Sequence, residues 1–284
     1  MLDLSVIILA KNEELHIRRC LENILPVTAE VFVIDCFSTD STVSICREYP
    51  RVQVLQHEWP GLYAPQFNWA LDNCPIRTAW VLRLDADEWF MPEALEELKE
   101  KLPALPEDVT GIIHKRRHIF LGRWMKHGVY PVKLLRLFRH GAARCEQRYM
   151  DEHIRLSRGH AVEFEHDFVD ENLNDLGWWA HKHVDYASRE LADLEDILSS
   201  STADSGSGIS GQAGKKRGMK ERYAHQPLFW RSFAYFCYRY FFKLGFLDGR
   251  EGFLWHFMQG WWYRTLVDAR QFEKQKNGSG KTPR

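Results

Sequence analysis

Short apolar runs alternate with helix-like segments along the first hundred residues. The runs occupy residues 4–10, 31–34, 52–55 and 79–84. A run such as LSVIILA is typical of a strand that is buried on both faces of a parallel sheet. The intervening segments place apolar residues at helical spacing, and Pro65 and Pro92 stand where a helix would begin. This alternation predicts an α/β fold with a doubly wound, mostly parallel sheet.

The pattern changes after Pro106. Strand-like runs then follow one another without helices, at residues 110–114, 132–138 and 161–164. We therefore expect antiparallel strands to be added at the edge of the sheet. The periodic segment over residues 171–198 predicts a long helix.

The later part of the chain differs in composition. Residues 199–218 are rich in Ser and Gly, which is typical of a flexible linker. Aromatic residues then recur at helical spacing almost to the end of the chain. We predict four parts: a catalytic α/β domain over residues 1–198, a flexible linker over 199–218, an aromatic helical extension over 219–273 and a disordered tail over 274–284.

Charge is distributed unevenly along the chain. The formal net charge is −1, yet residues 215–284 contain 15 Lys and Arg against 5 Asp and Glu. The remaining body is therefore acidic. Such asymmetry suggests contact with an anionic membrane or with nucleic acid. The apolar content of 45% excludes a largely disordered or collagen-like chain.

Cysteine usage and hydropathy indicate the compartment. The six cysteines form no C-x-x-C pair and no zinc-like spacing, as in proteins of reducing compartments. The N-terminal apolar run is too short and too closely flanked by charge for a signal peptide. No apolar stretch reaches the roughly 18–20 residues of a spanning helix. We expect a cytoplasmic protein.

Polar residues follow the predicted strands at their carboxyl ends, where open α/β sheets bind ligands. Asn12 and Glu13 follow the first strand, Asp35 follows the second, and Asp85 and Asp87 follow the fourth. Two carboxylates at one strand end can face a divalent cation, and their hard oxygens suit Mg²⁺ or Mn²⁺. A solvated acidic turn is the alternative, but the apolar strand AWVLRL just before it favours a metal site.

These segments also resemble a known family. LSVIILAKNEE, VFVIDCFSTDST, QFNWAL and LRLDADEWF are similar to successive motifs of the inverting family 2 glycosyltransferases, which have the GT-A fold. The resemblance is greatest to the bacterial branch that builds lipopolysaccharide core, O-antigen and capsule sugars. It is strong over about residues 3–100 and weaker beyond. It implies transfer of a sugar from a nucleotide-diphosphate donor, by default a UDP-hexose.

The resemblance also implies roles for individual residues. The donor-binding residues would be Ala10, Asn12, Glu13, Asp35, Gln66, Asn68 and Asp85. Asp40 would belong to the family's S-T-D turn and also cap a helix. The metal ligands would be Asp87, the stronger candidate, and Asp85, with His166 as a further ligand. A bound Mg²⁺ or Mn²⁺ would neutralise the diphosphate as the sugar–phosphate bond breaks.

Direct displacement with inversion requires a base for the acceptor hydroxyl. Related sequences often carry His-Glu where this chain has Asp151 and Glu152. That register favours Glu152 as the base, with Asp151 in place of the histidine, and a surface acidic pair remains the alternative. His166 follows the strand-like AVEFE, and a structural histidine is as compatible with the sequence as a metal ligand.

The aromatic extension predicts two helices, over residues 228–244 and 251–272. Arg231, Arg239 and Lys243 fall on one side of the first helix. We expect interfacial helices, with aromatic side chains at headgroup depth and Lys and Arg toward anionic lipid. Packing against the α/β domain is the alternative, and charges within each helix argue against a spanning hairpin. We expect no nucleic-acid partner, because no motif of that kind appears.

The phrase YRYFFKLGFLDGREGF resembles the C-terminal extension of the same glycosyltransferase branch. It implies a lipid-linked or lipopolysaccharide acceptor at the inner face of a bacterial inner membrane. GSGKT near the C-terminus is similar to a phosphate-binding loop but lacks the strand and helix that such a loop needs. The oligomeric state is not indicated by the sequence.

Two other functions compete with glycosyl transfer. A nucleotidyltransferase uses a similar sheet but usually has a Gly-rich basic loop after the first strand, where this chain has AKNEE. A catalytically silent membrane scaffold could retain the fold, but it would have no need for the full set of acidic residues.

Overall fold

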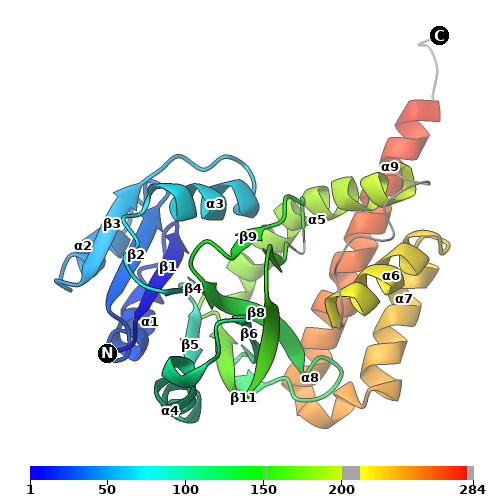
Figure 1. Cartoon of the computed structure of the whole chain (residues 1–284). Coiled ribbons are helices and arrows are strands. Elements are labelled where there is room, and N and C mark those ends of the chain that lie inside the picture. Colours follow the sequence, from blue (N-terminus) through cyan, green and yellow to red (C-terminus); the bar gives the residue numbers. More distant parts are fainter. Residues whose placement is uncertain (151, 200–211, 280–284) are drawn as a thin grey trace. The chain divides into compact units, whose positions relative to one another are not determined.

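The computed structural model describes residues 1–150, 152–199 and 212–279 (Figure 1). The chain forms two compact units. The first comprises Met1–Trp124 and Tyr130–Leu173, and the second comprises Met125–Val129 and the chain from Asn174 onward.

The first unit contains a large mixed sheet in which the strand order is β3-β2-β1-β4-β8-β6-β11-β5, with β7 paired to β6. Its N-terminal half is parallel, formed by β1 (Leu4–Ala10), β2 (Glu30–Asp35), β3 (Val52–Gln56) and β4 (Trp80–Asp85). Its other strands are β5 (Glu88–Phe90), β6 (Val109–Phe120), β7 (Arg123–Trp124), β8 (Val132–Arg139) and β11 (His160–Glu171). A separate ribbon pairs β9 (Ala143–Cys145) with β10 (Ile154–Leu156).

Helices cover both faces of the parallel half. Alternation along β1 sends Val6 and Ile8 into one apolar cluster and Ile7 into another. The first cluster is covered by α1 (Ile17–Ile24), α2 (Thr42–Cys46) and α4 (Pro92–Lys101), with the 3₁₀ turn η1 (Leu102–Ala104) after α4. The second is covered by α3 (Tyr63–Asn73). The predicted doubly wound α/β class is therefore confirmed.

The middle of the chain differs from the expectation in two respects. Strand β8 is antiparallel, but it lies inside the sheet between β4 and β6 instead of at an edge. Strand β11 is parallel to β6 and extends to Glu171, so the predicted helix start at 171 is wrong. The helix α5 (Leu176–Ser199) begins after Asp175, whose carboxylate accepts the Trp178 N–H at 2.8 Å.

The second unit is helical. It contains α5, α6 (Gln212–Ala224), α7 (Trp230–Cys237), the π turn η2 (Tyr238–Phe242) and the 3₁₀ turn η3 (Gly245–Asp248). A continuous helical segment follows as α8 (Gly249–Trp255), the π turn η4 (His256–Trp262) and α9 (Tyr263–Ser279). Its core includes Ala187, Leu194 and Val267. The predicted aromatic helical extension is therefore present, and α7 and α9 lie along one another as a helical hairpin.

The other predicted boundaries meet the structure only in part. Residues 200–211 of the predicted linker lie outside the described residues, whereas residues 212–218 belong to α6. Residues 274–279 of the predicted tail continue α9. In the described part of the chain, none of the helices combines the length and the apolar character needed to cross a bilayer.

Candidate functional site

The loop after β1 is bonded to the loop after β2. The Asn12 N–H donates to Ser38 Oγ at 2.8 Å, and Asn12 Oδ1 accepts the Thr39 N–H at 2.8 Å. The Glu13 N–H donates to Thr42 Oγ1 at 2.7 Å, and Glu13 Oε2 lies 2.7 Å from His16 Nδ1. Ala10 is buried at the start of this loop. The residues expected to cradle a nucleotide therefore lie at one edge of the sheet, where hydrogen bonds between the two loops hold them in place.

Asp35 lies fully buried at the end of β2. Its carboxylate accepts the Ser38 N–H at 3.1 Å and the side-chain amide of Gln56 at 3.2 Å. In the next turn, Asp40 accepts the Thr42 N–H at 3.0 Å. Burial opposes the ionisation of Asp40, but the hydrogen bonds from Thr42 outweigh it and lower the pKa of that carboxyl. Both acids thus organise the turn through backbone N–H groups.

Helix α3 supplies the two predicted amide side chains, and they do different things. Gln66 is buried, its Oε1 accepts from His57 Nδ1 at 2.6 Å, and its Nε2 donates to Cys36 Sγ at 3.2 Å. Asn68 bonds the backbone of Cys145 in both directions, at 2.8 and 3.0 Å. Gln66 therefore lies near the β2 end with Asp35, whereas Asn68 ties the ribbon strand β9 to α3.

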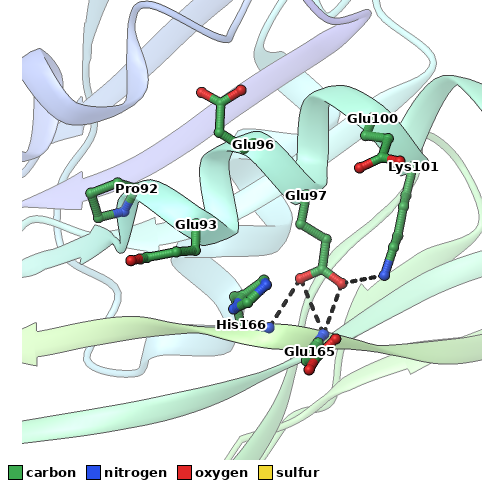
Figure 2. Close-up of a pocket in the computed structure, with 8 residues that line it drawn as sticks. All are labelled: Pro92, Glu93, Glu96, Glu97, Glu100, Lys101, Glu165 and His166. Atoms are coloured by element: carbon green, nitrogen blue, oxygen red, sulfur yellow. Dashed lines mark hydrogen bonds and ion pairs between the residues drawn. The ribbon is translucent and has the colours of Figure 1, made fainter.

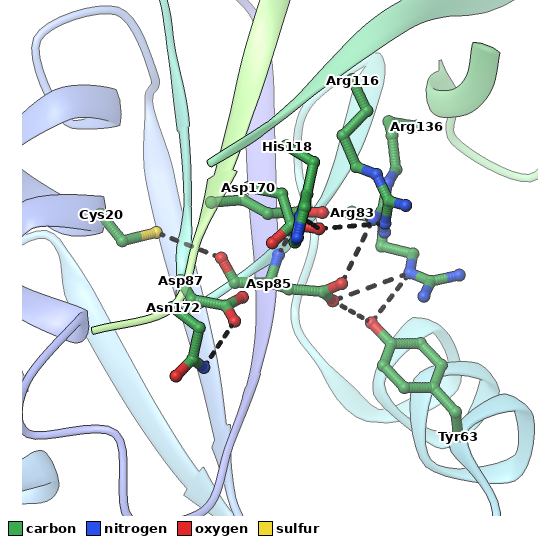
Figure 3. Close-up of polar contacts among 11 residues, drawn as sticks. Cys20, Tyr63, Arg83, Asp85, Asp87, Arg116, His118, Arg136, Asp170 and Asn172 are labelled. Carbon is green, nitrogen blue, oxygen red and sulfur yellow. Dashed lines mark hydrogen bonds and ion pairs between the residues drawn. The ribbon is translucent and has the colours of Figure 1, made fainter. Parts of the chain in front are cut away.

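Asp85 ends β4 and is held on both oxygens (Figure 3). Tyr63 donates to Oδ1 at 2.7 Å, and Arg136 Nη2 donates to Oδ2 at 3.2 Å. The Arg83 Nε lies 3.9 Å from Oδ1. Burial opposes ionisation, but the positive charges of Arg136 and Arg83 lower the pKa of Asp85 to about 2. Asp85 is therefore an anion over the whole physiological range of pH.

Asp87 lies in the turn between β4 and β5 and has a different environment. Asn172 donates its side-chain amide to Asp87 Oδ2 at 3.0 Å, and the Glu171 N–H donates to the Asp87 carbonyl oxygen at 3.1 Å. Both partners come from the end of β11. That strand therefore holds the turn in place, and Figure 3 shows Asp87 and Asn172 facing each other beside Asp85.

Several charged residues of this site escaped the sequence prediction. Glu88 is buried and accepts hydrogen bonds from Arg136 and from the Asp85 N–H. Burial raises the pKa of Glu88 against the opposing charge of Arg136, and Asp85 and Asp170 raise it further. Asp170, from β11, pairs with Arg116 at 3.1 Å and with His118 at 3.4 Å. The signal for Arg83 and Arg136 is a charge placed within an otherwise apolar strand, LRL and LLRLF.

The network contains unused hydrogen-bond donors. Arg136 is 5% exposed, yet its Nε and Nη1 have no partner among the described residues. The Nε of Arg116 is in the same condition. These guanidinium groups retain capacity for acceptor oxygens, such as those of a phosphate, after a small rearrangement.

The remaining predicted residues belong to the segment before β10 and to β11. Asp151 lies outside the described residues. Glu152 is half-buried just before β10, close enough to Cys145 that its charge contributes to the raised pKa of that thiol, for which burial is the main cause. His166 lies on β11 four residues before Asp170, and its N–H donates to Glu97 at 3.0 Å. The histidine that the structure does place beside the carboxylates is His118.

The His166 side chain instead lines a pocket of about 480 Å³ on α4 (Figure 2). Its other lining residues include Glu93, Glu96, Glu97 and Lys101. Glu97 is committed to the backbone N–H groups of Glu165 and His166 and to Lys101. The pocket is therefore an acidic helix face with its buried acid already satisfied.

The residues at the end of β4 fit a divalent cation only if substrate and water supply part of its coordination. Within residues 1–150, 152–199 and 212–279, no three His, Cys, Asp or Glu side chains are grouped to hold a metal. Mg²⁺ and Mn²⁺ commonly take one or two carboxylates from the protein and the remaining ligands from substrate phosphates and water. Asp87 and Asp85 are the residues that would supply such carboxylates.

Comparison with known proteins gives relatives over the same region. Residues 5–159 match the model of glycosyl transferase family 2. The lipopolysaccharide core biosynthesis glycosyltransferase LpsC of Rhizobium meliloti is 32% identical over 150 residues, which is 51% of this chain and 54% of that protein. An uncharacterized glycosyltransferase of Rickettsia typhi is 36% identical over 99 residues, 35% of this chain and 32% of the relative. The chain thus spans about half or less of the length of these curated relatives.

Two solved structures are similar in part. The crystal structure of residues 1–349 of S. aureus TarS aligns with a TM-score of 0.49 at 14% identity, covering 100% of this chain and 93% of the other. The glucosyl-3-phosphoglycerate synthase of Mycobacterium tuberculosis, crystallised with Mn²⁺, UDP and glucosyl-3-phosphoglycerate, gives a TM-score of 0.33 at 20% identity over 41% of this chain and 44% of that one. The family match covers more than half of the chain and contains the carboxyl-terminal ends of β1, β2 and β4. This chain belongs to glycosyl transferase family 2.

Proposed function

We propose that this chain transfers a sugar from a nucleotide-diphosphate donor to a lipid-linked or lipopolysaccharide glycan, by direct displacement with inversion. The observation that carries the proposal is the row of polar strand ends within the family match: Asn12 after β1, Asp35 at the end of β2, and Asp85 with Asp87 after β4. Strands β2, β1 and β4 are neighbours, so these ends share one edge of the sheet. A UDP-hexose is the default donor.

The donor's nucleotide would lie over the ends of β1 and β2. Asp35 and Gln66 are buried there, and a buried carboxylate and amide can read the polar edge of a base. Asn12 and Glu13 are fixed through the 36–42 loop, which keeps the surface rigid. Asn68 supports this region indirectly, because its amide is engaged with the Cys145 backbone.

The diphosphate would lie beside Asp85 and Asp87. Asp87, with Asp85 behind it, would hold Mg²⁺ or Mn²⁺, which when bound lends positive charge to the leaving diphosphate. Arg136 and Arg116 have N–H groups without partners among the described residues, and these can donate to phosphate oxygens. Tyr63 and Arg83 keep Asp85 in one orientation, so the charges on which bond cleavage depends are set before the donor binds.

The acceptor hydroxyl must lose a proton as it attacks. Glu152 is our candidate base, with Asp151 as the alternative, because a carboxylate within hydrogen-bonding distance can accept that proton. The ribbon of β9 and β10 carries the segment between residues 145 and 154, and α3 anchors it through Asn68. This arrangement would bring a base on that segment to the site in a defined position.

The acceptor class and location follow from the relatives and from the helical unit. LpsC acts, by its name, in lipopolysaccharide core biosynthesis, and an acceptor of that kind is anchored in lipid. We propose that residues 219–273 attach the chain to the anionic inner face of the bacterial inner membrane, as a peripheral cytoplasmic protein. Deleting residues 219–284 should abolish sedimentation with anionic vesicles, with circular dichroism to verify that the remainder folds.

A panel of nucleotide sugars tests the reaction. The full chain is incubated with each donor, Mn²⁺ and a lipopolysaccharide-core acceptor, and nucleoside diphosphate release is measured. We expect one donor to be consumed, with the opposite anomeric configuration in the product by NMR. Glu152→Gln should lower kcat by about 10²–10⁴-fold with donor affinity unchanged. Glu163→Gln, an exposed acid paired with Lys133, is the matched control and should retain activity.

A product of retained configuration would contradict direct displacement. Pyrophosphate release from a nucleoside triphosphate and a sugar phosphate would replace the proposal with a nucleotidyltransferase. Full activity of both Glu152→Gln and Asp151→Asn would remove both candidate bases.

A further inference from the structure

The turn between α7 and α8 exposes apolar side chains to an unusual degree. We define the tip surface as Phe241, Phe242, Leu244, Phe246, Leu247 and Phe253. Phe242 is 78% exposed and Phe241 is 54% exposed, values that are rare for large apolar groups on a protein that contacts only water. Grouped exposed apolar side chains of this kind commonly mark an interaction site.

Two arginines of the same hairpin lie inside it. Arg231 is 3% exposed and Arg239 is 5% exposed, which corrects the expectation that both face lipid. Arg231 Nε donates to Asp268 at 2.7 Å and its Nη2 donates to Gln271 at 2.7 Å. On α7, Trp230 and Phe233 point outward instead. The first helix of the hairpin thus buries its arginines and exposes aromatic side chains, the reverse of the pattern in a helix that faces only water.

The fully exposed charges of the tip are cations. Within residues 241–250, all of which the structure describes, every exposed side chain is apolar or cationic, and Glu251, the next residue, is half-buried. The cations are Lys243 and Arg250. The acid of this stretch, Asp248, is 3% exposed and is bound by His127 through its N–H at 2.8 Å and its Nδ1 at 2.6 Å. Aromatic and cationic groups side by side match the headgroup region of an anionic bilayer.

Packing beneath the tip holds its shape. The Tyr240 ring contacts the rings of Phe241, Phe246 and Phe253, with centroids 5.1, 6.2 and 5.8 Å apart. The turn itself needs Gly245, because a Cβ there would lie 2.3 Å from His256 Nε2 and 3.0 Å from the Arg239 carbonyl oxygen. The apolar side chains are therefore presented on a rigid support, which lowers the entropic cost of binding.

We propose that the tip surface inserts into the boundary between headgroups and acyl chains of an anionic bilayer, with Lys243 and Arg250 at lipid phosphates. This inference rests on the membrane-associated function proposed above and narrows residues 219–273 to the turn at 241–253. A second copy of the chain fits less well. A two-fold contact through this surface would bring Lys243 and Arg250 of both copies close together, with the half-buried Glu251 as the acid nearest to them in the chain.

Vesicle sedimentation of the full chain tests the inference. The double variant Phe242→Ser, Phe246→Ser should bind vesicles of phosphatidylcholine and phosphatidylglycerol at least ten-fold more weakly than the natural chain. Phe272→Ser is the matched control, because Phe272 is 52% exposed but packs on Phe229 at the open end of the hairpin. It should bind as the natural chain does. Lys243→Glu with Arg250→Glu should remove the preference for phosphatidylglycerol over phosphatidylcholine alone.

Two results would overturn the inference. One is equal vesicle binding by the natural chain and the Phe242→Ser, Phe246→Ser variant. The other is a natural chain that ignores vesicles but sediments as a dimer in ultracentrifugation, with the same variant monomeric. Binding to vesicles by a chain that consumes no nucleotide sugar would support the inference while contradicting the proposed function. Consumption of a soluble donor by the tip variant, at the natural rate, would show that the variant folds.

Discussion

At the scale of single residues, two carboxylates separated by one alanine have different tasks. Asp85 is engaged on both oxygens by Tyr63 and Arg136. Asp87 receives the Asn172 amide at 3.0 Å, and its turn is fixed by the end of β11. We therefore assign Asp85 to orienting the charged network and Asp87 to holding the cation.

The pH dependence of stability tests the role of Asp85. Asp85→Asn should lower the free energy of unfolding by about 1–3 kcal/mol near neutral pH, because Arg83 and Arg136 lose a shared counter-ion. The pKa of Asp85 falls from its ordinary 3.8 to about 2 in the folded protein. Its contribution is therefore present above about pH 4 and is lost as the pH falls toward 2.

Thermal unfolding of both proteins between pH 6 and pH 2 measures this difference. The gap between the natural chain and Asp85→Asn should close on the acid side. Asp72→Asn is the control, since Asp72 forms an exposed pair with Arg144 and such pairs contribute little. A gap that stays constant down to pH 2 would show that the charge of Asp85 does not stabilise the fold.

Sequence patterns found some of these residues and missed others for a physical reason. Asp35, Asp85 and Asp87 were predictable because they follow apolar strands directly along the chain. Arg116, His118, Arg136 and Asp170 come from β6, β8 and β11, and they meet the site only through pairing between distant strands. His166 was placed at the metal because strand β11 was predicted to end near it, whereas β11 continues and brings Asp170 to Glu88.

At the scale of elements, Asn68 of α3 bonds the backbone of β9, and an exposed ion pair between Asp72 and Arg144 also joins the two elements. Asn68 satisfies both the N–H and the carbonyl of Cys145. Asn68→Ala should leave two backbone groups without partners and cost about 1–3 kcal/mol. Since β9 begins the segment that carries Glu152, kcat should also fall while the affinity for the nucleotide changes little.

Asn73→Ala is the comparison for that variant, because Asn73 bonds the Trp69 carbonyl on an exposed turn of the same helix. Calorimetry of nucleotide binding and steady-state kinetics separate the two effects. A loss of nucleotide affinity with normal kcat in Asn68→Ala would mean that Asn68 contacts the donor directly, as the family resemblance implies.

The helical hairpin depends on a buried ion pair. Arg231 and Asp268 have side chains 1% and 0% exposed, and Asp268 also accepts the Phe229 N–H at 2.8 Å. Asp268→Ala should cost about 3–5 kcal/mol, because it leaves Arg231 buried without a counter-ion. Adding Arg231→Met should recover part of that loss. A double-mutant cycle tests this, with urea unfolding monitored by the circular dichroism of the helices. If the losses in the free energy of unfolding from the two single variants simply added in the double variant, the two side chains would not form a stabilising pair.

The elements of the second unit were the hardest to predict from local patterns. Helical spacing along residues 228–244 placed the arginines on one side correctly, but it could not say whether that side faces water. The answer depends on Asp268 and Gln271, more than thirty residues later, which supply the partners that make burial of Arg231 favourable. Strands β6 and β11 were predicted too short because charged residues alternate along them.

At the scale of the whole molecule, the near-zero net charge is the sum of an acidic body and a basic C-terminal part, for which we propose different functions. The family match, residues 5–159, covers the carboxylate site and lies almost entirely in the first unit. The basic, aromatic C-terminal part forms helices of the second unit. We infer that the first unit supplies the chemistry and the second supplies attachment to the membrane that holds the acceptor.

The most direct test is donor turnover by the natural chain and by Asp87→Ala, each with Mn²⁺ and with a chelator. We expect the natural chain to release nucleoside diphosphate from one nucleotide sugar only when the metal is present. Asp87→Ala should be at least 100-fold slower with the metal, and Asp72→Ala should match the natural chain. Metal-dependent turnover that survives in Asp87→Ala, or no turnover of any nucleotide sugar by the natural chain, would contradict the account.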